Sequence, residues 1–270
     1  MNLHPGARVI DATLGLGGHA MMILKQIGTN GQLTGFDRDA QNLDLARQQL
    51  ATYEAQITFI NDSFGNMSAH DLQPVDAILF DLGFSSVHVD DASRGFSFLR
   101  EGPLDMRYDK AQELTAETIV NGWSKDELAE LFRVFGEEPR AREIAAAICK
   151  GRKKQRIVTT TQFADLVEMV VKRRGRIHPA TRVFQALRIV TNDEFGEIKK
   201  GLTSAVNLLK PGGRLVVITF HSLEDRIVKQ FLKESEGLAV LTKKAIKPTH
   251  NEIQSNPRSR SALVRIAEKG

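Results

Sequence analysis

The stretch Asp11-Ala-Thr-Leu-Gly-Leu-Gly-Gly-His-Ala20 joins an apolar segment, Arg8–Ala12, to a segment with helical spacing, His19–Ile27. Glycines between a predicted strand and a predicted helix let the backbone approach a ligand, and the helix start offers backbone N–H groups. The stretch also fits the G-x-G-x-x-A pattern of dinucleotide-binding loops. A glycine turn that only packs the helix on the strand is the alternative interpretation.

An acidic residue after the next predicted strand favours a ligand. Gln32–Phe36 predicts that strand, and Asp37 follows it, 19 residues after Gly18. A carboxylate at this position accepts hydrogen bonds from ribose hydroxyls. Both NAD and S-adenosylmethionine (SAM) place a ribose there, and Asp11 at the end of the first strand suits the amino-acid part of SAM.

Strand and helix patterns alternate over most of the chain. Strands are predicted at Arg8–Ala12, Gln32–Phe36, Ile57–Ile60, Val75–Phe80, Arg214–Phe220 and Leu263–Ala267, and helices at His19–Ile27, Asp39–Tyr53, Asp193–Leu209 and Ser222–Glu236. This alternation predicts a parallel sheet with helices on both faces.

The alternation is interrupted after the fourth strand. Residues 83–109 show no sustained periodicity and predict a long loop, which inside a domain is usually functional or disordered. Helical spacing then predicts helices at Thr115–Asn121, Lys125–Val134, Glu138–Cys149, Thr160–Val171 and Thr181–Ile189. We therefore predict an α/β core formed by residues 1–105 and 191–270, with a helical insertion over residues 106–190.

Charge is distributed unevenly, although the net charge is only +4. Residues 140–188 hold 13 basic and 3 acidic side chains, whereas residues 1–139 hold 10 basic and 21 acidic ones. Dense clusters lie at Lys150–Arg156 and Lys172–Arg176. The asymmetry favours a polyanionic partner, with a solvated basic face on helices as the alternative. No amphipathic anchor with exposed aromatic residues accompanies the clusters, which disfavours a membrane surface.

Composition predicts a cytoplasmic globular protein. Hydrophobic residues make up 41% and charged residues 26% of the chain, which excludes general disorder. No apolar run approaches the ~20 residues of a membrane helix, and residues 1–6 lack the features of a signal peptide. Cys149 is the only cysteine, so disulfides and thiolate metal clusters are excluded. Since no histidine or carboxylate cluster has metal-ligand spacing, we expect the reaction to need no metal.

Two further motifs favour SAM over NAD. Leu208–Val217 is very similar to the entry into the fifth strand of SAM-dependent methyltransferases. Asp81-Leu-Gly-Phe84 stands where amino-group methyltransferases carry a D-P-P-Y-like motif, but it lacks the prolines.

The chain strongly resembles the MraW (RsmH) family, which methylates N4 of a specific cytidine in bacterial 16S ribosomal RNA. The matching blocks are Asp11–His19, Phe36–Asp39, Asp81–Ser86, Arg94–Phe98, Gly102–Arg107, Gly136–Glu138, His178–Arg188, Phe220–Lys229 and Asn256–Ser261. Several of these blocks are long and unusual. The resemblance implies a class I SAM-dependent methyltransferase fold, which is Rossmann-like, with the helical insertion after the fourth strand.

The resemblance also implies a set of cofactor contacts. SAM would contact Gly17, Gly18 and His19 in the glycine loop, Asp37 would hold its ribose, Phe64 would pack on the adenine, and Asp81 would line the methionine side. His88 occupies the last contact position, where the family usually has glutamine, and Val87 replaces a proline.

Asp81 is also the candidate catalytic residue. The N4 amine of cytosine is a poor nucleophile, so the site needs an acceptor that orients the amine and takes its proton. Asp81 would accept the amine N–H directly, or the backbone carbonyls of residues 82–84 would do so. A role for Asp81 in binding the cofactor alone is the equally weighted alternative. Phe84 would stack on the base or, as we favour, only pack in place.

The candidate RNA contacts lie mainly in the basic segment, at Arg107, Lys153, Lys154, Arg173 and Arg182. Arg107 would contact RNA or, as slightly favoured, order its loop by pairing with Asp105. His178 would cap a helix. We also hypothesise that Lys150, Arg152, Lys153, Lys154 and Arg156 bind RNA as a group, extended by the basic tail of Lys243, Lys244, Lys247, Arg258 and Arg260.

The implied partner is 16S ribosomal RNA, within the small ribosomal subunit. A NAD-linked oxidoreductase fits the glycine pattern but not the other blocks. The family carries a segment before the first strand that this chain lacks, and we expect weakened activity if that segment covers the SAM pocket. An inactive RNA-binding relative is therefore the third alternative.

Overall fold

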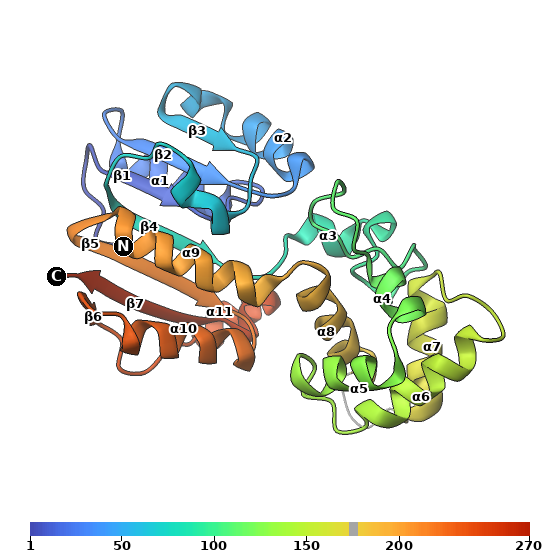
Figure 1. Cartoon of the computed structure of the whole chain (residues 1–270). Coiled ribbons are helices and arrows are strands. Elements are labelled where there is room, and N and C mark those ends of the chain that lie inside the picture. Colours follow the sequence, from blue (N-terminus) through green and yellow to red (C-terminus); the bar gives the residue numbers. More distant parts are fainter. Residues whose placement is uncertain (173–177) are drawn as a thin grey trace. The chain divides into compact units, whose positions relative to one another are not determined.

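The computed structural model describes residues 1–172 and 178–270, which form two compact units (Figure 1). The sheet unit consists of Met1–Phe84 and Phe195–Gly270, and the helical unit of Ser85–Glu194. The units divide earlier than the predicted boundary after residue 105. Residues 85–105 belong to the helical unit because Phe96, Phe98 and Leu104 pack in its apolar core.

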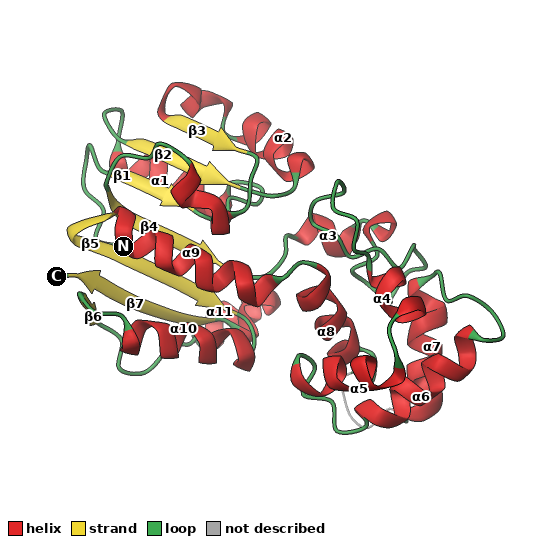
Figure 2. Cartoon of the chain, in the orientation of Figure 1, coloured by secondary structure: helices red, strands yellow, loops and turns green. Residues whose placement is uncertain are grey.

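The sheet unit contains a seven-stranded sheet in the order β3-β2-β1-β4-β5-β7-β6 (Figure 2). The strands are β1 (Arg8–Asp11), β2 (Gln32–Phe36), β3 (Ile57–Ile60), β4 (Val75–Asp81), β5 (Leu209–Thr219), β6 (Leu238–Val240) and β7 (Leu263–Lys269). Strands β1 to β5 pair in parallel, whereas β7 runs antiparallel to both β5 and β6. The parallel pairing predicted from the alternation holds for β1 to β5, and the antiparallel direction of β7 was not predicted because the apolar pattern of a strand does not encode its direction.

Helices cover both faces of this sheet. They are α1 (Gly18–Ile27), α2 (Ala40–Gln49), α9 (Glu194–Leu208), α10 (Ser222–Glu234) and α11 (His250–Ser255), with short 3₁₀ helices η1 (Ala51–Gln56), η2 (Phe64–Ala69) and η4 (Pro257–Ser261). Successive residues of a strand point to opposite faces. Ala77 and Leu79 accordingly pack in one core with α1 and α2, and Ile78 and Phe80 in a second core with α9 and α10. The predicted Rossmann-like α/β architecture is confirmed.

The helical unit has its own core. Its helices are α3 (Ser86–Asp90), α4 (Ala116–Gly122), α5 (Lys125–Val134), α6 (Ala141–Arg152), α7 (Thr160–Val170) and α8 (Thr181–Thr191), with the turn η3 (Ala92–Arg94). The side chains of Thr115, Ser124 and Thr159 cap α4, α5 and α7 by accepting backbone N–H groups of the first turn. Helix α3 lies within residues 83–109, which were predicted as a loop. No helix in the described part of the chain is long and apolar enough to span a membrane.

Candidate functional site

The glycine loop lies between β1 and α1 in the sheet unit. Gly15 and Gly17 have φ angles of 52° and 86°, in the left-handed region that favours glycine. A Cβ atom on Gly17 would lie 2.9 Å from Cδ1 of Leu50, so the loop packs tightly on that side. A Cβ atom on Gly18 would meet nothing within 4 Å, and no side chain caps the start of α1. The loop thus leaves space and a helix N-terminus open to a ligand.

Asp37 connects the end of β2 to this loop. Its Oδ2 accepts a hydrogen bond from the backbone N–H of Gly15 at 2.9 Å and from the side-chain amide of Asn42 at 3.2 Å. Its Oδ1 accepts the backbone N–H of Asp39 at 2.8 Å. These bonds fix the carboxylate, which is only half-buried. Asp37 is therefore held where it can also accept hydrogen bonds from ligand hydroxyls.

Asp81 ends β4 and contacts the same loop. Its backbone N–H donates to Oγ1 of Thr13 at 2.6 Å, and its Oδ2 lies 3.4 Å from Nε2 of His19. The interaction with Asp81 raises the pKa of His19 above its ordinary value. The Oδ1 atom of Asp81 is buried and has no hydrogen-bond partner among the described residues.

Asp11 ends β1 and is 1% exposed. Its Oδ1 accepts the backbone N–H of Thr13 at 3.2 Å, whereas its buried Oδ2 has no partner in the described part of the chain. Burial raises the pKa of Asp11 to about 7, against the opposing charge of His19. A buried carboxylate oxygen without a donor is costly, so Asp11 and Asp81 together favour a ligand that carries N–H groups and positive charge.

Phe64 begins η2, after β3. Its ring packs edge-to-face on Phe80 with centroids 5.4 Å apart, and a Cβ atom on Gly201 would lie 2.6 Å from Phe64 Cδ2. The ring is thus held by β4 and α9 while remaining partly exposed. Ser63 accepts the backbone N–H of Gly65 at 3.1 Å and fixes the turn.

His88 belongs to the helical unit and is 3% exposed there. Its ring stacks on Phe96, with centroids 4.8 Å apart, and lies 5.2 Å from that of Tyr108. Its Nδ1 accepts the backbone N–H of Ser85 at 3.2 Å. These contacts give His88 a packing and capping role that the sequence did not predict.

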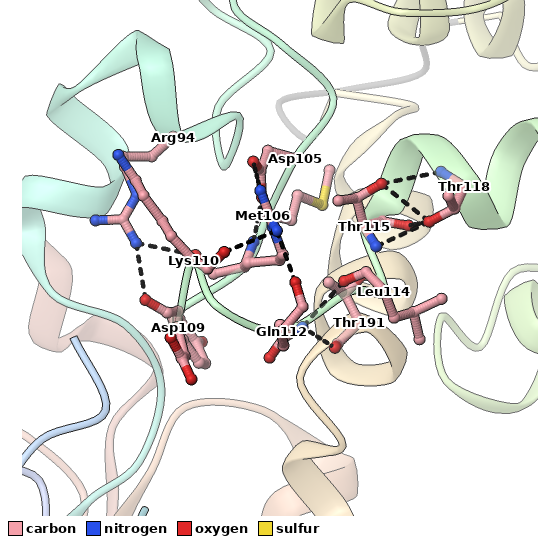
Figure 3. A network of polar contacts seen from close by, with 12 residues as sticks. Arg94, Asp105, Met106, Asp109, Lys110, Gln112, Leu114, Thr115, Thr118 and Thr191 are labelled. Atoms are coloured by element: carbon pink, nitrogen blue, oxygen red, sulfur yellow. Dashed lines mark hydrogen bonds and ion pairs between the residues drawn. The ribbon is translucent and has the colours of Figure 1, made fainter. Parts of the chain in front are cut away.

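A polar network in the helical unit includes Arg94, Asp105 and Gln112 (Figure 3). The Arg107 guanidinium donates to both Asp105 carboxylate oxygens at 2.8 Å and to the carbonyls of Lys110 and Gln112 at 2.9 and 2.6 Å. Arg94, 2% exposed, donates to the carbonyls of Arg107 and Tyr108 at 2.9 and 3.1 Å. The geometry supports loop ordering as the role of Arg107.

Arg94→Met is expected to destabilise the helical unit by about 2–4 kcal/mol. The substitution removes the buried guanidinium and leaves the carbonyls of Arg107 and Tyr108 without this donor. Urea unfolding monitored by fluorescence of Trp123, which packs against the core of this unit, measures the change. Arg133→Met, which removes an exposed pair with Glu130, is the control and should change stability by less than about 0.5 kcal/mol. Equal effects of both substitutions would refute this role for Arg94.

Some of the candidate RNA-binding side chains already form hydrogen bonds or ion pairs within the chain, and others are exposed. Arg152 donates to the carbonyl of Val120 at 2.7 Å, and Arg156 pairs with Glu117 at 2.7 Å. The side chains of Lys150, Lys153 and Lys154 are exposed at the end of α6. Arg182 lies at the start of α8, and Arg173 lies outside the described residues.

Two of the matching sequence blocks lie at the start of a helix. His221 and Glu224 form the capping box of α10, in which the Glu224 carboxylate accepts the backbone N–H of Phe220 at 2.8 Å. His178 precedes α8, and its Nδ1 accepts the backbone N–H of Ala180 at 3.1 Å. This bond reaches the N-cap residue itself and not the first turn of α8, which has no side-chain cap, so the predicted capping role of His178 was wrong.

The structure connects the glycine loop, His19, Asp37 and Asp81 within one unit. Sequence analysis missed Thr13 and Gly15, whose contacts with Asp81 and Asp37 make those connections. Gly15 belongs to the quoted glycine pattern, which was the available signal. Nothing in the sequence singled out Thr13.

Comparison with known proteins identifies relatives over the whole chain. A family model described as the MraW methylase family matches residues 1–270. "Ribosomal RNA small subunit methyltransferase H" of Dictyoglomus thermophilum is 46% identical over 275 residues, covering 100% of this chain and 92% of that protein. The protein of the same name from Thermomicrobium roseum is 47% identical over 287 residues, covering 98% of this chain and 88% of that protein.

Proposed function

Since the chain belongs to the MraW methylase family, we propose that its sheet unit transfers a methyl group from SAM to the N4 amine of a cytidine in 16S ribosomal RNA. The chain is a SAM-dependent ribosomal RNA methyltransferase with a class I fold. Its substrate would be presented within the small ribosomal subunit, in the cytoplasm. The observation that carries the cofactor site is the buried Oδ2 of Asp11 beside the glycine loop, which has no hydrogen-bond partner among the described residues.

The residues of the site fit SAM. Gly18 leaves the space that the cofactor would fill, Asp37 would accept the ribose hydroxyls, and Asp11 would accept the ammonium group. Phe64 would offer its exposed face to the adenine. SAM supplies an electrophilic methyl group on a positively charged sulfur.

The chain's own residues then orient the nucleophile. An RNA cytidine must leave its stack to present its amine. Asp81 Oδ1 would accept an amine N–H and hold the nitrogen for in-line attack, and the carboxylate would take the released proton. His19 contacts that carboxylate, and Thr13 fixes the Asp81 backbone by accepting its N–H. The His88 position remains a proposed cofactor contact, weakened by its packing against Phe96.

Titration calorimetry with SAM tests the cofactor site. We expect binding by the wild-type chain and a loss of affinity in Asp37→Ala, because the ribose hydroxyls lose their acceptor. Asp71→Ala, an exposed carboxylate elsewhere in the sheet unit, is the control. Equal SAM affinity in both variants would argue against this cofactor position.

SAM affinity is expected to weaken as the pH falls through about 7. Asp11 has a pKa of about 7 in the folded chain, and protonation removes the negative charge that would bind the ammonium group. Over pH 5.5–7 the α-amino group of SAM stays protonated and carries about one positive charge. The dissociation constant should therefore approach a tenfold rise per pH unit below 7. Calorimetry across this pH range measures how the dissociation constant of SAM changes with pH. The substitution Asp11→Asn should remove this pH dependence.

The same raised pKa also affects folding stability. Between the ordinary pKa of an aspartate and about 7, the folded chain binds more protons at Asp11 than the unfolded chain does. The contribution of Asp11 to stability is therefore greatest at acidic pH and falls as the pH rises to about 7.

The Asp11→Asn variant also tests the role of Asp11 in SAM binding. If the pH dependence of SAM affinity persists unchanged in this variant, Asp11 is not the acceptor of the ammonium group.

The exposed lysines at the end of α6 are expected to bind RNA phosphates. Replacing Lys150, Lys153 and Lys154 together by alanine should flatten the dependence of log affinity on log salt by about 0.7–0.9 for each phosphate that the variant no longer neutralises. Filter binding of 16S RNA over a salt series measures the slope. Lys199→Ala with Lys233→Ala, on the sheet unit, is the control. An unchanged slope in the triple variant would exclude these lysines as RNA-binding residues.

A further inference from the structure

Phe220 directly follows β5 and lies beside the end of β4 in the sheet unit. The two strands pair in parallel with Asp81 opposite Ile218, and the backbone N–H of Leu82 donates to the carbonyl of Ile218 at 2.9 Å. A Cβ atom on Gly83 would lie 3.5 Å from Cδ2 of Phe220. The Phe220 ring is therefore next to the segment that begins with the proposed amine acceptor, Asp81.

The alternation of both strands places this ring on the same face of the sheet as Asp81. Successive residues of a strand point to opposite faces. Leu79 packs in the core with α1 and α2, and Asp81 follows it by two residues on β4. Ile218 packs against the same core, and Phe220 follows it by two residues. The carboxylate and the ring thus share the face that also carries the glycine loop.

A buried carboxylate holds the backbone of Phe220. Glu224 is 1% exposed, and its Oε2 accepts the backbone N–H groups of Phe220 at 2.8 Å and of His221 at 3.3 Å. The His221 ring lies 6.2 Å from that of Phe195, which packs in the core with α9 and α10 on the opposite face. Phe220 accordingly points away from that core, and its side chain is only half-buried.

The residue beside the ring leaves it uncovered. Gly83 is exposed and has a φ of 116°, in the region that favours glycine. A side chain at this position would lie against the Phe220 ring at ordinary contact distance. Next to it, Oδ1 of Asp81 is buried and has no hydrogen-bond partner among the described residues. The site therefore combines a flat apolar surface with an acceptor that needs a donor.

We propose that the Phe220 ring stacks on the target cytosine while Asp81 Oδ1 accepts an N–H of its amine. The inference rests on the proposed function and names the side chain that would hold the base. Enzymes that act on an unstacked base hold it between aromatic or apolar side chains, which replace the stacking it has lost. Phe84, 43% exposed in the same segment, is the competing aromatic residue.

The test compares Phe220→Leu, which keeps an apolar side chain but loses the flat ring, with Phe220→Tyr, which keeps the ring. Phe231→Leu is the matched control, since Phe231 is a half-buried phenylalanine of α10 that packs on the opposite face. Phe84→Leu tests the competing residue. Glu224 is left intact because it also belongs to the capping box of α10.

Four quantities are measured for each variant. They are the maximal single-turnover rate of methyl transfer to small ribosomal subunits, the KM for subunits, the SAM affinity by calorimetry and the melting temperature. Phe220→Leu should lower the maximal rate by about 10- to 100-fold, because a base that loses its stacking partner is less often in place for attack. Its KM, SAM affinity and melting temperature should match those of Phe231→Leu, and Phe220→Tyr should transfer methyl at close to the wild-type rate.

The opposite results would overturn the inference while leaving the proposed function intact. These are a control-like rate in Phe220→Leu, a fall in rate found only in Phe84→Leu, or a fall in Phe220→Leu matched by losses of SAM affinity and melting temperature. Failure of the wild-type chain to methylate the subunits would instead refute the proposed function itself.

Discussion

Asp81→Asn is expected to lower kcat for methyl transfer by about 10²–10³-fold. The substitution keeps the shape of the side chain, and the backbone bond to Thr13 is unaffected. The variant loses the negative charge beside His19 and cannot take the proton released from the amine. Single-turnover methyl transfer at saturating SAM and RNA measures this loss.

Calorimetry with SAM separates the two roles considered for Asp81. An amine acceptor predicts a large fall in kcat with little change in SAM affinity, whereas a purely cofactor-binding carboxylate predicts that SAM affinity falls most. Asp76→Asn is the matched control, since Asp76 lies near the start of the same strand and bonds Lys210 at 2.7 Å. Wild-type kcat and SAM affinity in Asp81→Asn would contradict both roles.

Gly18→Ala is expected to weaken SAM binding by about 10- to 100-fold, as an overpacked contact of about 1–3 kcal/mol implies. In the folded chain the added methyl group meets nothing within 4 Å and would occupy the space assigned to the cofactor. Alanine also favours the helix more than glycine does, so the melting temperature should stay the same or rise. Calorimetry and thermal melting provide the two measurements.

Gly122→Ala is the control for this substitution. Gly122 ends α4 in the helical unit, and its added Cβ also meets nothing within 4 Å. Gly17→Ala is unsuitable, because its φ of 86° and its contact with Leu50 would strain the folded chain itself. Undiminished SAM affinity in Gly18→Ala would place the cofactor elsewhere.

The local pattern of the sequence predicted the part of the fold in which we propose the cofactor site. Strands Gln32–Phe36 and Ile57–Ile60 have the predicted bounds, and the glycine loop lies where predicted. Asp11, Asp37 and Asp81 each follow or end a parallel strand, and such ends meet at one edge of a sheet. The proximity of these three carboxylates was therefore predictable from the order of the strands along the chain.

Long-range pairing explains what could not be predicted. The direction of β7 depends on its partners β5 and β6, which its own residues do not specify. The burial of Arg94 depends on carbonyls more than ten residues away. The cofactor contact of His88 stays a prediction, whereas its stacking on Phe96 and its tilted contact with the Tyr108 ring depend on loop contacts that no local pattern encodes.

Methyl transfer from labelled SAM to small ribosomal subunits that lack the modification tests the central claim most directly. Mass mapping of the RNA product identifies the modified nucleotide and atom. We predict N4-methylcytidine at a single position in 16S RNA, abolished or strongly reduced in Asp81→Asn. Binding of SAM without any transfer to the RNA, or transfer to another atom or nucleotide, would contradict the proposed reaction.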